Sequence, residues 1–310
     1  MDRNESVFER FPDYIREYIY QHSWEALREI QLLAAESIFY TQNNLLLTSS
    51  TASGKTEAAF FPILTMLEGN LPESVAVLYI APLKSLINDQ FSRIEELLDI
   101  SGIPVTHWHG DVAQSHKKKL LDKPRGILQI TPESLESMLM NRSNDLIRLF
   151  HGLEFVIIDE VSMVDIFLMN YLVKAIYLGT KLVLVGDIDQ LPSVGPGSVL
   201  KSIINSERFV TVYLDKIFRQ AAKSKIILNA HNVNKGEGFI GKNPDSVDLK
   251  DDFFYVNEYN QNKMLSTILS LSKDRLKKYG DYDFFKNIQV ITPSKKGLIG
   301  GNNYALPPRC

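Results

Sequence analysis

One stretch constrains the fold of this chain more than any other. Residues 45–56 read LLLTSSTASGKT, an apolar run that gives way to small polar residues and ends on Gly54, Lys55 and Thr56. The apolar run predicts a buried parallel strand, and the residues from Glu57 onward predict the start of a helix. A strand, a tight loop and a helix in this order direct a helix N-terminus and several backbone N–H groups at one point. We therefore predict a phosphate-binding loop within an α/β fold.

The polar residues of this loop have separable chemical tasks. Gly54 lets the backbone approach a phosphate closely, the Lys55 amine reaches the terminal phosphates of a nucleotide, and the Thr56 hydroxyl can hold Mg²⁺. The pattern G-x-x-x-x-G-K-S/T lacks its first glycine here, because Ser49 stands at that position. The alternative interpretation is a helix cap formed by Ser50 or Thr51. The predicted nucleotide site comprises Ser50, Thr51, Ala52, Ser53, Gly54, Lys55 and Thr56.

A second element with a chemical signature is the acidic pair Asp159 and Glu160, which directly follows the apolar run at residues 155–158. Adjacent carboxylates after a buried strand suit Mg²⁺-assisted phosphoryl chemistry. Asp159 would hold the metal through water, and Glu160 would orient or deprotonate the attacking water. The alternative is that the two charges cap the helix that begins near Met163.

Apolar runs that alternate with helical segments predict a parallel sheet. Strand-like runs begin at Val75, Val105, Gly126, Phe155 and Lys181. Their alternation with helical segments is typical of strands joined by crossover helices. In such sheets the loops after the carboxyl ends of the strands line the ligand crevice. Four candidate binding residues fall in these loops: Lys84, Ser85, Thr131 and Glu133.

Upstream of the phosphate loop, residues 8–38 carry two helical patterns, and Gln31 lies on the second. A glutamine in this place can read the edge of an adenine through two hydrogen bonds, with Tyr14 or Phe11 stacking on the base. The alternative is an exposed glutamine on a helix surface. The local sequence does not favour one interpretation over the other.

Composition narrows the class of protein. The chain has 310 residues, 45% of them hydrophobic and 23% charged, which is typical of a globular protein. No apolar run approaches the about 20 residues of a membrane span, and the polar N-terminus does not resemble a signal peptide, so we expect a cytoplasmic protein with no membrane partner. The single cysteine, Cys310, excludes disulfides and a cysteine-based metal site within one chain. We do not expect zinc at His107 and His109, which lack evident partner ligands.

The net charge of −3 provides no overall attraction to nucleic acid. Nucleic-acid binding would therefore depend on local basic runs, such as residues 117–119 and 295–296. The alternative for each run is an ordinary solvated face.

With these motifs in place, the chain resembles helicases of two superfamilies. Residues 1–160 resemble the first RecA-like domain of superfamily 2 DEAD/DEAH-box helicases, closest to the Lhr-like group, in REIQ, STASGKTEAA, APLKSLINDQ, HWHGD, ITPESLESML and VIIDE. Residues 160–297 resemble superfamily 1 RecD-like helicases in DEVSMVD, KLVLVGDIDQLPSVGPGSVL, LDKIFRQ and VITPSKKG. Ser162 stands where a Lhr-like protein is expected to have a histidine that couples ATP to nucleic acid. The two resemblances meet at the acidic pair, which indicates a hybrid or fused chain, and residues 298–310 fit neither family.

The resemblance implies specific partners and roles. The cofactors would be ATP and Mg²⁺, and the partner would be single-stranded or duplex DNA, with RNA as the alternative. Gln190 resembles a glutamine that senses the γ-phosphate, and Arg219 resembles an arginine that stabilises transition-state charge from the neighbouring domain. Lys55 and Glu160 would complete the catalytic set. The implied nucleic-acid contacts are Lys84, Ser85, Thr131 and Glu133.

The expected architecture is a RecA-like P-loop NTPase domain over residues 1–205, with a parallel sheet and flanking helices. A second RecA-like domain is expected to begin at residue 206 and to include a strand at residues 288–291; it is expected to be truncated, because the later helicase motifs are absent. The leading hypothesis is an ATP-dependent DNA helicase-family protein, incomplete as a motor. The alternatives are a nucleotide-dependent nucleic-acid-binding module with little turnover and a non-functional hybrid.

Overall fold

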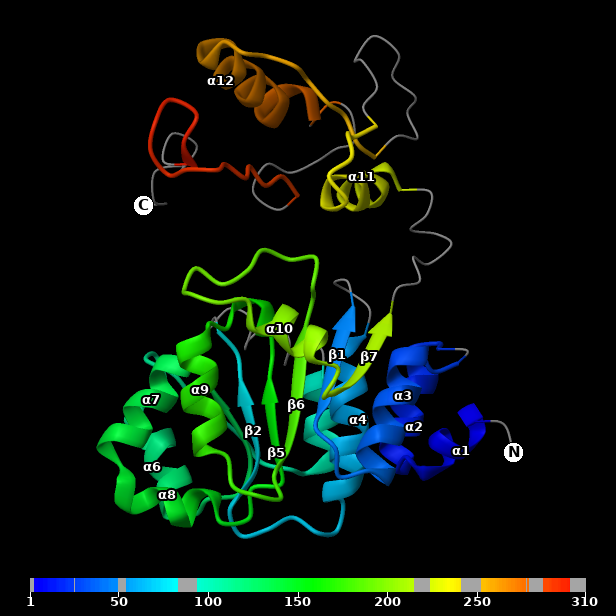
Figure 1. Ribbon diagram of the computed structural model, residues 1–310, viewed down its shortest axis with the longest axis vertical. Coiled ribbons are helices and arrows are strands. Elements are labelled where there is room, and N and C mark those ends of the chain that lie inside the picture. The colour runs from blue at the N-terminus through cyan, green and yellow to red at the C-terminus, as the bar shows by residue number, and fades with distance from the viewer. Residues whose placement is uncertain are drawn as a thin grey trace. The chain divides into compact units, whose positions relative to one another are not determined.

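The chain divides into two compact units, which are described separately. The first unit is Met1–Lys216 and the second is Ile217–Cys310. Figure 1 shows the elements of both units in a computed structural model. The structure describes residues 3–24, 26–49, 54–82, 94–214, 224–240, 252–276, 278 and 287–301.

In the described part of the first unit, a seven-stranded parallel sheet has the order β3-β4-β2-β5-β6-β1-β7. The strands are rich in Val, Ile and Leu, and most are buried along their whole length, as parallel strands covered on both faces require. The predicted parallel sheet with flanking helices is therefore confirmed. The strands are β1 Leu45–Ser49, β2 Val75–Ile80, β3 Val105–Trp108, β4 Gly126–Ile130, β5 Phe155–Ile158, β6 Lys181–Gly186 and β7 Val210–Leu214.

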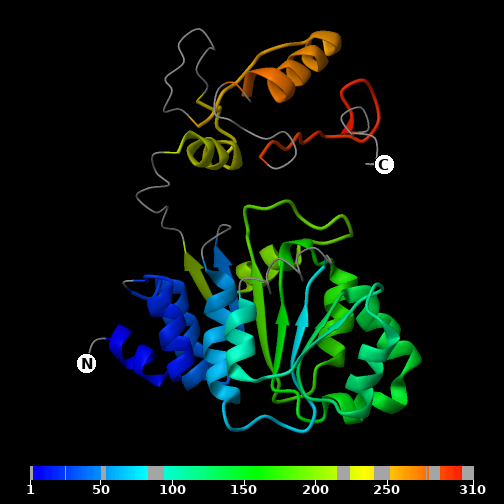
Figure 2. The same ribbon diagram turned by 180° about the vertical axis from the view of Figure 1, so that it is seen from behind.

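Helices cover both faces of this sheet (Figures 1 and 2). Buried side chains form one core cluster on each face, and their removal from water supplies the main favourable term in folding. One face carries α1 Arg3–Arg10, α2 Asp13–Gln21, α3 Glu29–Tyr40 and α4 Lys55–Leu67. The other carries α6 Gln114–Asp122, α7 Pro132–Asn141, α8 Ser143–Phe150, the short 3₁₀ helix η1 Val161–Met163, α9 Ile166–Ala175 and α10 Val199–Ser206. Among the described residues no helix is both long and apolar enough to cross a membrane.

The edge strand β7 lies beyond the predicted domain boundary at residue 205. Residues Val210 to Leu214 pair in parallel with all five residues of β1, so the first unit extends to Lys216. The consecutive β-branched residues Val210, Thr211 and Val212 favour a strand. So short a run is a weak signal by itself, and its partner strand β1 lies far away in the sequence.

The described residues of the second unit contain helices and no strand. These are α11 Lys225–Asn234, α12 Gln261–Ser270 and a π-helix at Leu271–Arg275. The buried Asn229 side chain exchanges two hydrogen bonds with the backbone of Ile240. The predicted strand at residues 288–291 is wrong. Its sequence, IQVI, has strand propensity, but a strand requires a pairing partner, and propensity does not supply one.

The first unit has an apolar pocket where the two family resemblances meet. The pocket has a volume of about 330 Å³ and lies between α7, α8 and α9, with Leu135, Phe150 and Leu172 in its lining. Helix α9 buries Met169 and Leu172, while Phe167 and Tyr171 on its outer side are about 60% exposed. Helix α9 thus meets the core through a narrow apolar stripe and leaves unfilled volume beside it.

A buried lysine connects the RecD-like block to the Lhr-like block through hydrogen bonds. Lys181 begins β6 in the RecD-like block and is 6% exposed. Its Nζ donates to the carbonyl oxygens of Ser37 (2.9 Å), Ile38 (3.2 Å) and Thr41 (2.7 Å), at the end of α3 in the Lhr-like block. The last carbonyl oxygens of a helix lack hydrogen-bond donors within the helix and carry partial negative charge. The amine of a lysine there donates hydrogen bonds to these oxygens, and its positive charge is attracted to the helix end. Burial lowers the pKa of the Lys181 amine.

Replacement of Lys181 by methionine is expected to lower the free energy of unfolding by about 2–4 kcal/mol, because the carbonyls of Ile38 and Thr41 lose this donor. The Ser37 carbonyl also loses it but keeps the Thr41 hydroxyl as a second donor. Denaturant unfolding followed by circular dichroism measures this change. Lys174→Met, at an exposed position on α9, is the matched control and should change stability by less than about 0.5 kcal/mol. If the two variants had the same free energy of unfolding, water would have replaced the hydrogen bonds of the Lys181 amine without loss of stability, and the prediction would be wrong.

Candidate nucleotide-binding site

Three neighbouring strands bring the predicted site residues to one edge of the sheet. Strands β5, β6 and β1 are adjacent and parallel, so their carboxyl ends lie together. Asp159 and Glu160 follow β5, Asp187 follows β6, and the loop that leads to Lys55 follows β1. All of these side chains are buried or partly buried, so this edge gathers one cation and three carboxylates away from bulk water.

Gly54 has the backbone conformation that a phosphate loop needs before its helix. Its φ of +85° lies in the left-handed region, and it is the N-cap of α4. A Cβ atom at this position would lie 3.0 Å from Nε2 of Gln31. Gln31 is 1% exposed, and its Oε1 accepts from the backbone N–H of Arg28 (2.9 Å). Within the described part of the chain, its Nε2 has no hydrogen-bond partner. A buried amide with an unsatisfied donor beside the loop is costly unless a ligand completes it.

Gln31 is therefore not an exposed helix residue, which was the alternative interpretation. The suggested stacking role of Phe11 is wrong, because this ring is 1% exposed and packs against Phe39 and Phe61 in the core. Tyr14 is half-buried and packs against the same core cluster.

Lys55 is the first residue of α4 and points back across the loop. Its Nζ donates to the carbonyl oxygen of Ser49 at 2.6 Å. Burial lowers the pKa of the Lys55 amine, whereas the negative charges of Asp187, Glu160 and Asp159 act in the opposite direction. The amine thus lies in the field of three carboxylates, where it can bind an anionic phosphate together with the positive end of the helix dipole.

Asp159 is 5% exposed and is held from two sides. Its Oδ1 accepts from the backbone N–H of Glu160 at 2.9 Å, and its Oδ2 accepts from the hydroxyl of Tyr79. Burial raises the pKa of the Asp159 carboxyl, and the Tyr79 hydroxyl, the Glu160 N–H and the Lys55 charge oppose this rise. Burial and the Asp159 charge also raise the pKa of Tyr79, so its phenol keeps its proton and acts as the donor.

Glu160 adopts a backbone conformation that is unusual for a residue with a side chain. Its φ of 49° and ψ of 47° are left-handed, which costs about 1–2 kcal/mol and is most often retained at functional sites. Burial, and next the charge of Asp159, raise the pKa of the Glu160 carboxyl. Its Oε2 is buried and has no hydrogen-bond partner among the residues that the structure describes, so this oxygen is in a position to accept a proton.

Gln190 lies beside this carboxylate. Its side chain hydrogen-bonds Glu160, and its Oε1 accepts from the Ser162 hydroxyl at 3.4 Å. Ser162 thus connects the acidic pair to the turn after β6. Within that turn the Asp187 carboxylate accepts from the backbone N–H of Asp189 at 3.0 Å, and the Gln190 N–H donates to the Asp187 carbonyl at 3.3 Å.

Two residues of this site were not predicted. Asp187 is 6% exposed and its charge acts on Lys55; its position directly after a buried strand was the available signal. Tyr79 is the only residue of the apolar run VAVLYI with a polar group, but nothing in the sequence indicated that it would reach Asp159, which lies 80 positions away.

The structure describes only some of the remaining predicted site residues. Thr56 is half-buried in the first turn of α4. Several predicted residues lie outside the described residues: Ser50, Thr51, Ala52, Ser53, Lys84, Ser85 and Arg219.

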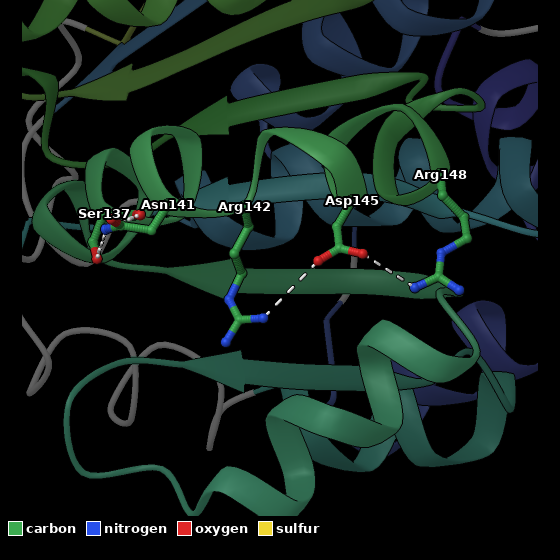
Figure 3. Close-up of polar contacts among 5 residues, drawn as sticks. All are labelled: Ser137, Asn141, Arg142, Asp145 and Arg148. Atoms are coloured by element: carbon green, nitrogen blue, oxygen red, sulfur yellow. Dashed lines mark hydrogen bonds and ion pairs between the residues drawn. The ribbon is translucent and has the colours of Figure 1, made fainter.

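The predicted nucleic-acid contacts Thr131 and Glu133 are at the start of α7 (Figure 3 shows the end of this helix). Thr131 is buried and its hydroxyl donates to Ser134 (3.0 Å), whereas Glu133 is exposed in the first turn. At the other end of α7, Asn141 donates to the Ser137 carbonyl at 2.9 Å. On the next helix, α8, Asp145 lies between Arg142 and Arg148.

Comparisons with sequence families match the chain in two overlapping blocks. Residues 28–169 match the family described as DEAD/DEAH box helicase, and residues 107–248 match an AAA domain family. The overlap contains the acidic pair.

Individual relatives include helicases of both kinds. The ATP-dependent helicase Lhr-Core of Methanocaldococcus jannaschii is 29% identical over 175 residues, which are 51% of this chain and 20% of that protein. The ATP-dependent RecD2 DNA helicase of Deinococcus radiodurans is 42% identical over 84 residues, which are 27% of this chain and 12% of that protein. The matched parts thus span a fifth or less of these relatives.

Among solved structures, the DUF1998 helicase MrfA bound to DNA and AMPPNP has a TM-score of 0.56 at 18% identity, over 85% of this chain and 35% of that one. This likeness shows the fold alone. Together with the two sequence blocks and the site geometry, it shows that the chain resembles P-loop helicases, of the superfamily 2 Lhr-like kind in its first block and the superfamily 1 RecD-like kind in its second.

Proposed function

We propose that this chain binds and hydrolyses ATP with Mg²⁺ and couples hydrolysis to binding or movement on single-stranded DNA. The observation that carries the proposal is the group formed by Lys55, Asp159, Glu160 and Asp187 at the carboxyl ends of adjacent strands. A cation, a buried carboxylate and a second carboxylate with a free oxygen are the parts that phosphoryl transfer to water requires.

The residues present fit a magnesium nucleotide. The unsatisfied Nε2 of Gln31 beside Gly54 offers a buried donor for the base. Mg²⁺ keeps several waters and binds phosphate oxygens, so one carboxylate and one hydroxyl from the protein are sufficient; Asp159 and Thr56 would hold it. When bound, the metal would neutralise charge on the phosphates.

The side chains of this protein then have distinct tasks. Lys55 and the N-terminus of α4 bind the phosphates and hold them in place. Glu160 accepts a proton from the attacking water at Oε2, the oxygen without a partner. Gln190, which bonds both Glu160 and Ser162, orients that carboxylate and links it to the turn after β6.

The nucleic-acid part of the proposal is supported by the relatives, whose printed names are those of helicases, two of them named as DNA-acting or DNA-bound. The relevant surface would include the loops after β2 and β4, where Lys84, Ser85, Thr131 and Glu133 lie in the sequence. Ser162 replaces the coupling histidine expected of the Lhr-like group, so coupling would pass through Ser162 and Gln190, as the RecD-like resemblance implies.

The test is ATP hydrolysis by the purified chain with Mg²⁺, measured with and without single-stranded DNA. We expect a basal rate that single-stranded DNA raises severalfold, and a smaller effect of single-stranded RNA of matched length. Tight binding of ATP without hydrolysis in either condition would contradict the enzyme proposal and favour the nucleotide-dependent binding module. Absence of Mg²⁺-dependent nucleotide binding would overturn the proposal altogether.

A further inference from the structure

Tyr79 is a buried tyrosine in the sheet whose hydroxyl reaches the acidic pair. It is the fifth of the six residues of β2 and is 1% exposed. The strand register places it opposite Ile157 of β5, two residues before Asp159. Its hydroxyl donates to Oδ2 of Asp159.

The ring of Tyr79 also contacts the helix of the phosphate loop. Its centroid lies 5.8 Å from that of Phe60 on α4, with an angle of 45° between the rings. Helix α4 begins at Lys55 and Thr56. One side chain therefore touches both the helix that presents the phosphate-binding residues and the carboxylate that completes the site.

The two hydrogen bonds to Asp159 fix the orientation of its carboxylate. An aspartate carboxylate rotates over a broad range about its last bond. Here one oxygen accepts from the Glu160 N–H and the other accepts from Tyr79, so rotation would break both bonds in a buried place where water cannot replace them. A carboxylate oxygen has two lone pairs, and each keeps one for another ligand.

We propose that Tyr79 is a positioning residue for the magnesium site: its hydroxyl orients the Asp159 carboxylate, and its ring sets the place of that carboxylate relative to α4. This inference rests on the proposed function. Groups that hydrogen-bond a metal-ligating side chain typically change metal affinity by about 10–100-fold when they are removed.

Tyr79→Phe tests the inference, because it removes the hydroxyl and keeps the buried ring. Binding of a fluorescent ATP analogue is measured as Mg²⁺ is varied. We expect the Mg²⁺ concentration for half-maximal enhancement of binding to rise by about 10-fold, with binding in the absence of Mg²⁺ unchanged. Tyr18→Phe is the matched control, since Tyr18 is also buried and packs on Phe61 of α4, but it does not hydrogen-bond Asp159.

A double-mutant cycle separates positioning from a general loss of structure. If Tyr79 acts through Asp159, Tyr79→Phe should have no further effect on the Mg²⁺ response in an Asp159→Asn background. An unchanged or lowered Mg²⁺ requirement in Tyr79→Phe, or an equal effect in both backgrounds, would overturn the inference. Failure of the wild-type chain to show any Mg²⁺-dependent nucleotide binding would instead overturn the proposed function.

Discussion

Replacement of Lys55 by alanine is expected to reduce ATP hydrolysis by at least about 100-fold, the effect of removing one preorganised charge or donor from a reacting group, and to weaken nucleotide binding as well. The amine is mostly removed from water and lies in the field of Asp187, Glu160 and Asp159. Without the Lys55 amine, the bound phosphates would lie near three carboxylates, and its positive charge would no longer offset their repulsion. Hydrolysis is followed by phosphate release, and binding is followed with a fluorescent ATP analogue.

The control for Lys55→Ala is Lys118→Ala, which removes an exposed lysine from the basic run on α6. This variant should keep the basal rate of the wild-type chain. Lys118→Ala should also keep the melting temperature of the wild-type chain. Lys55→Ala is expected to lower it, because the Ser49 carbonyl loses this donor and three carboxylates lose a nearby positive charge, so both variants are assayed well below their melting temperatures. If Lys55→Ala hydrolysed ATP at the wild-type rate, the proposed role of the phosphate loop in the mechanism would be wrong.

The parts of the fold that could be predicted are those encoded by local pattern. The run VAVLYI lies between Ser74 and the pair Ala81-Pro82 and predicts β2 with its observed bounds. The strand, loop and helix around Lys55 follow from one continuous stretch of sequence, as does the acidic pair after β5. These signals are strong because parallel strands buried on both faces need continuous apolar runs.

The parts that escaped prediction depend on which distant segments meet. Tyr79 reaches Asp159 only because β2 pairs with β5 in the observed register. Phe11 was a candidate for contact with a base, but tertiary packing places it inside the core. The run IQVI at residues 288–291 has the composition of a strand and forms none, since pairing, not propensity, decides whether a strand exists.

The contacts at the junction of the two blocks also depend on which distant segments meet. Lys181 of one block satisfies carbonyl groups at the end of a helix from the other, and Ser162, Gln190 and Glu160 form one hydrogen-bonded group across the meeting point. The apolar pocket beside α9 lies at the same junction. Polar contacts thus connect the two blocks both at the site and at the end of α3.

Replacement of Glu160 by glutamine is expected to slow the chemical step by about 10²–10⁴-fold while nucleotide binding persists, because the amide cannot accept a proton from water. Glutamine has nearly the shape of glutamate and can still hydrogen-bond Gln190, so the group with Ser162 should survive. Single-turnover hydrolysis with excess protein measures the chemical step, and the fluorescent analogue measures binding.

The exposed Glu136 of α7 supplies the control, and Glu136→Gln should hydrolyse ATP at the wild-type rate. Loss of both binding and turnover in Glu160→Gln would indicate that the carboxylate holds the site together and does not act as a base. Retention of turnover would transfer the role to Asp187, the buried carboxylate near Lys55 that is not assigned to Mg²⁺, and Asp187→Asn would then test this. Binding without turnover is the outcome that the free Oε2 of Glu160 predicts, because that oxygen has no structural bond to lose.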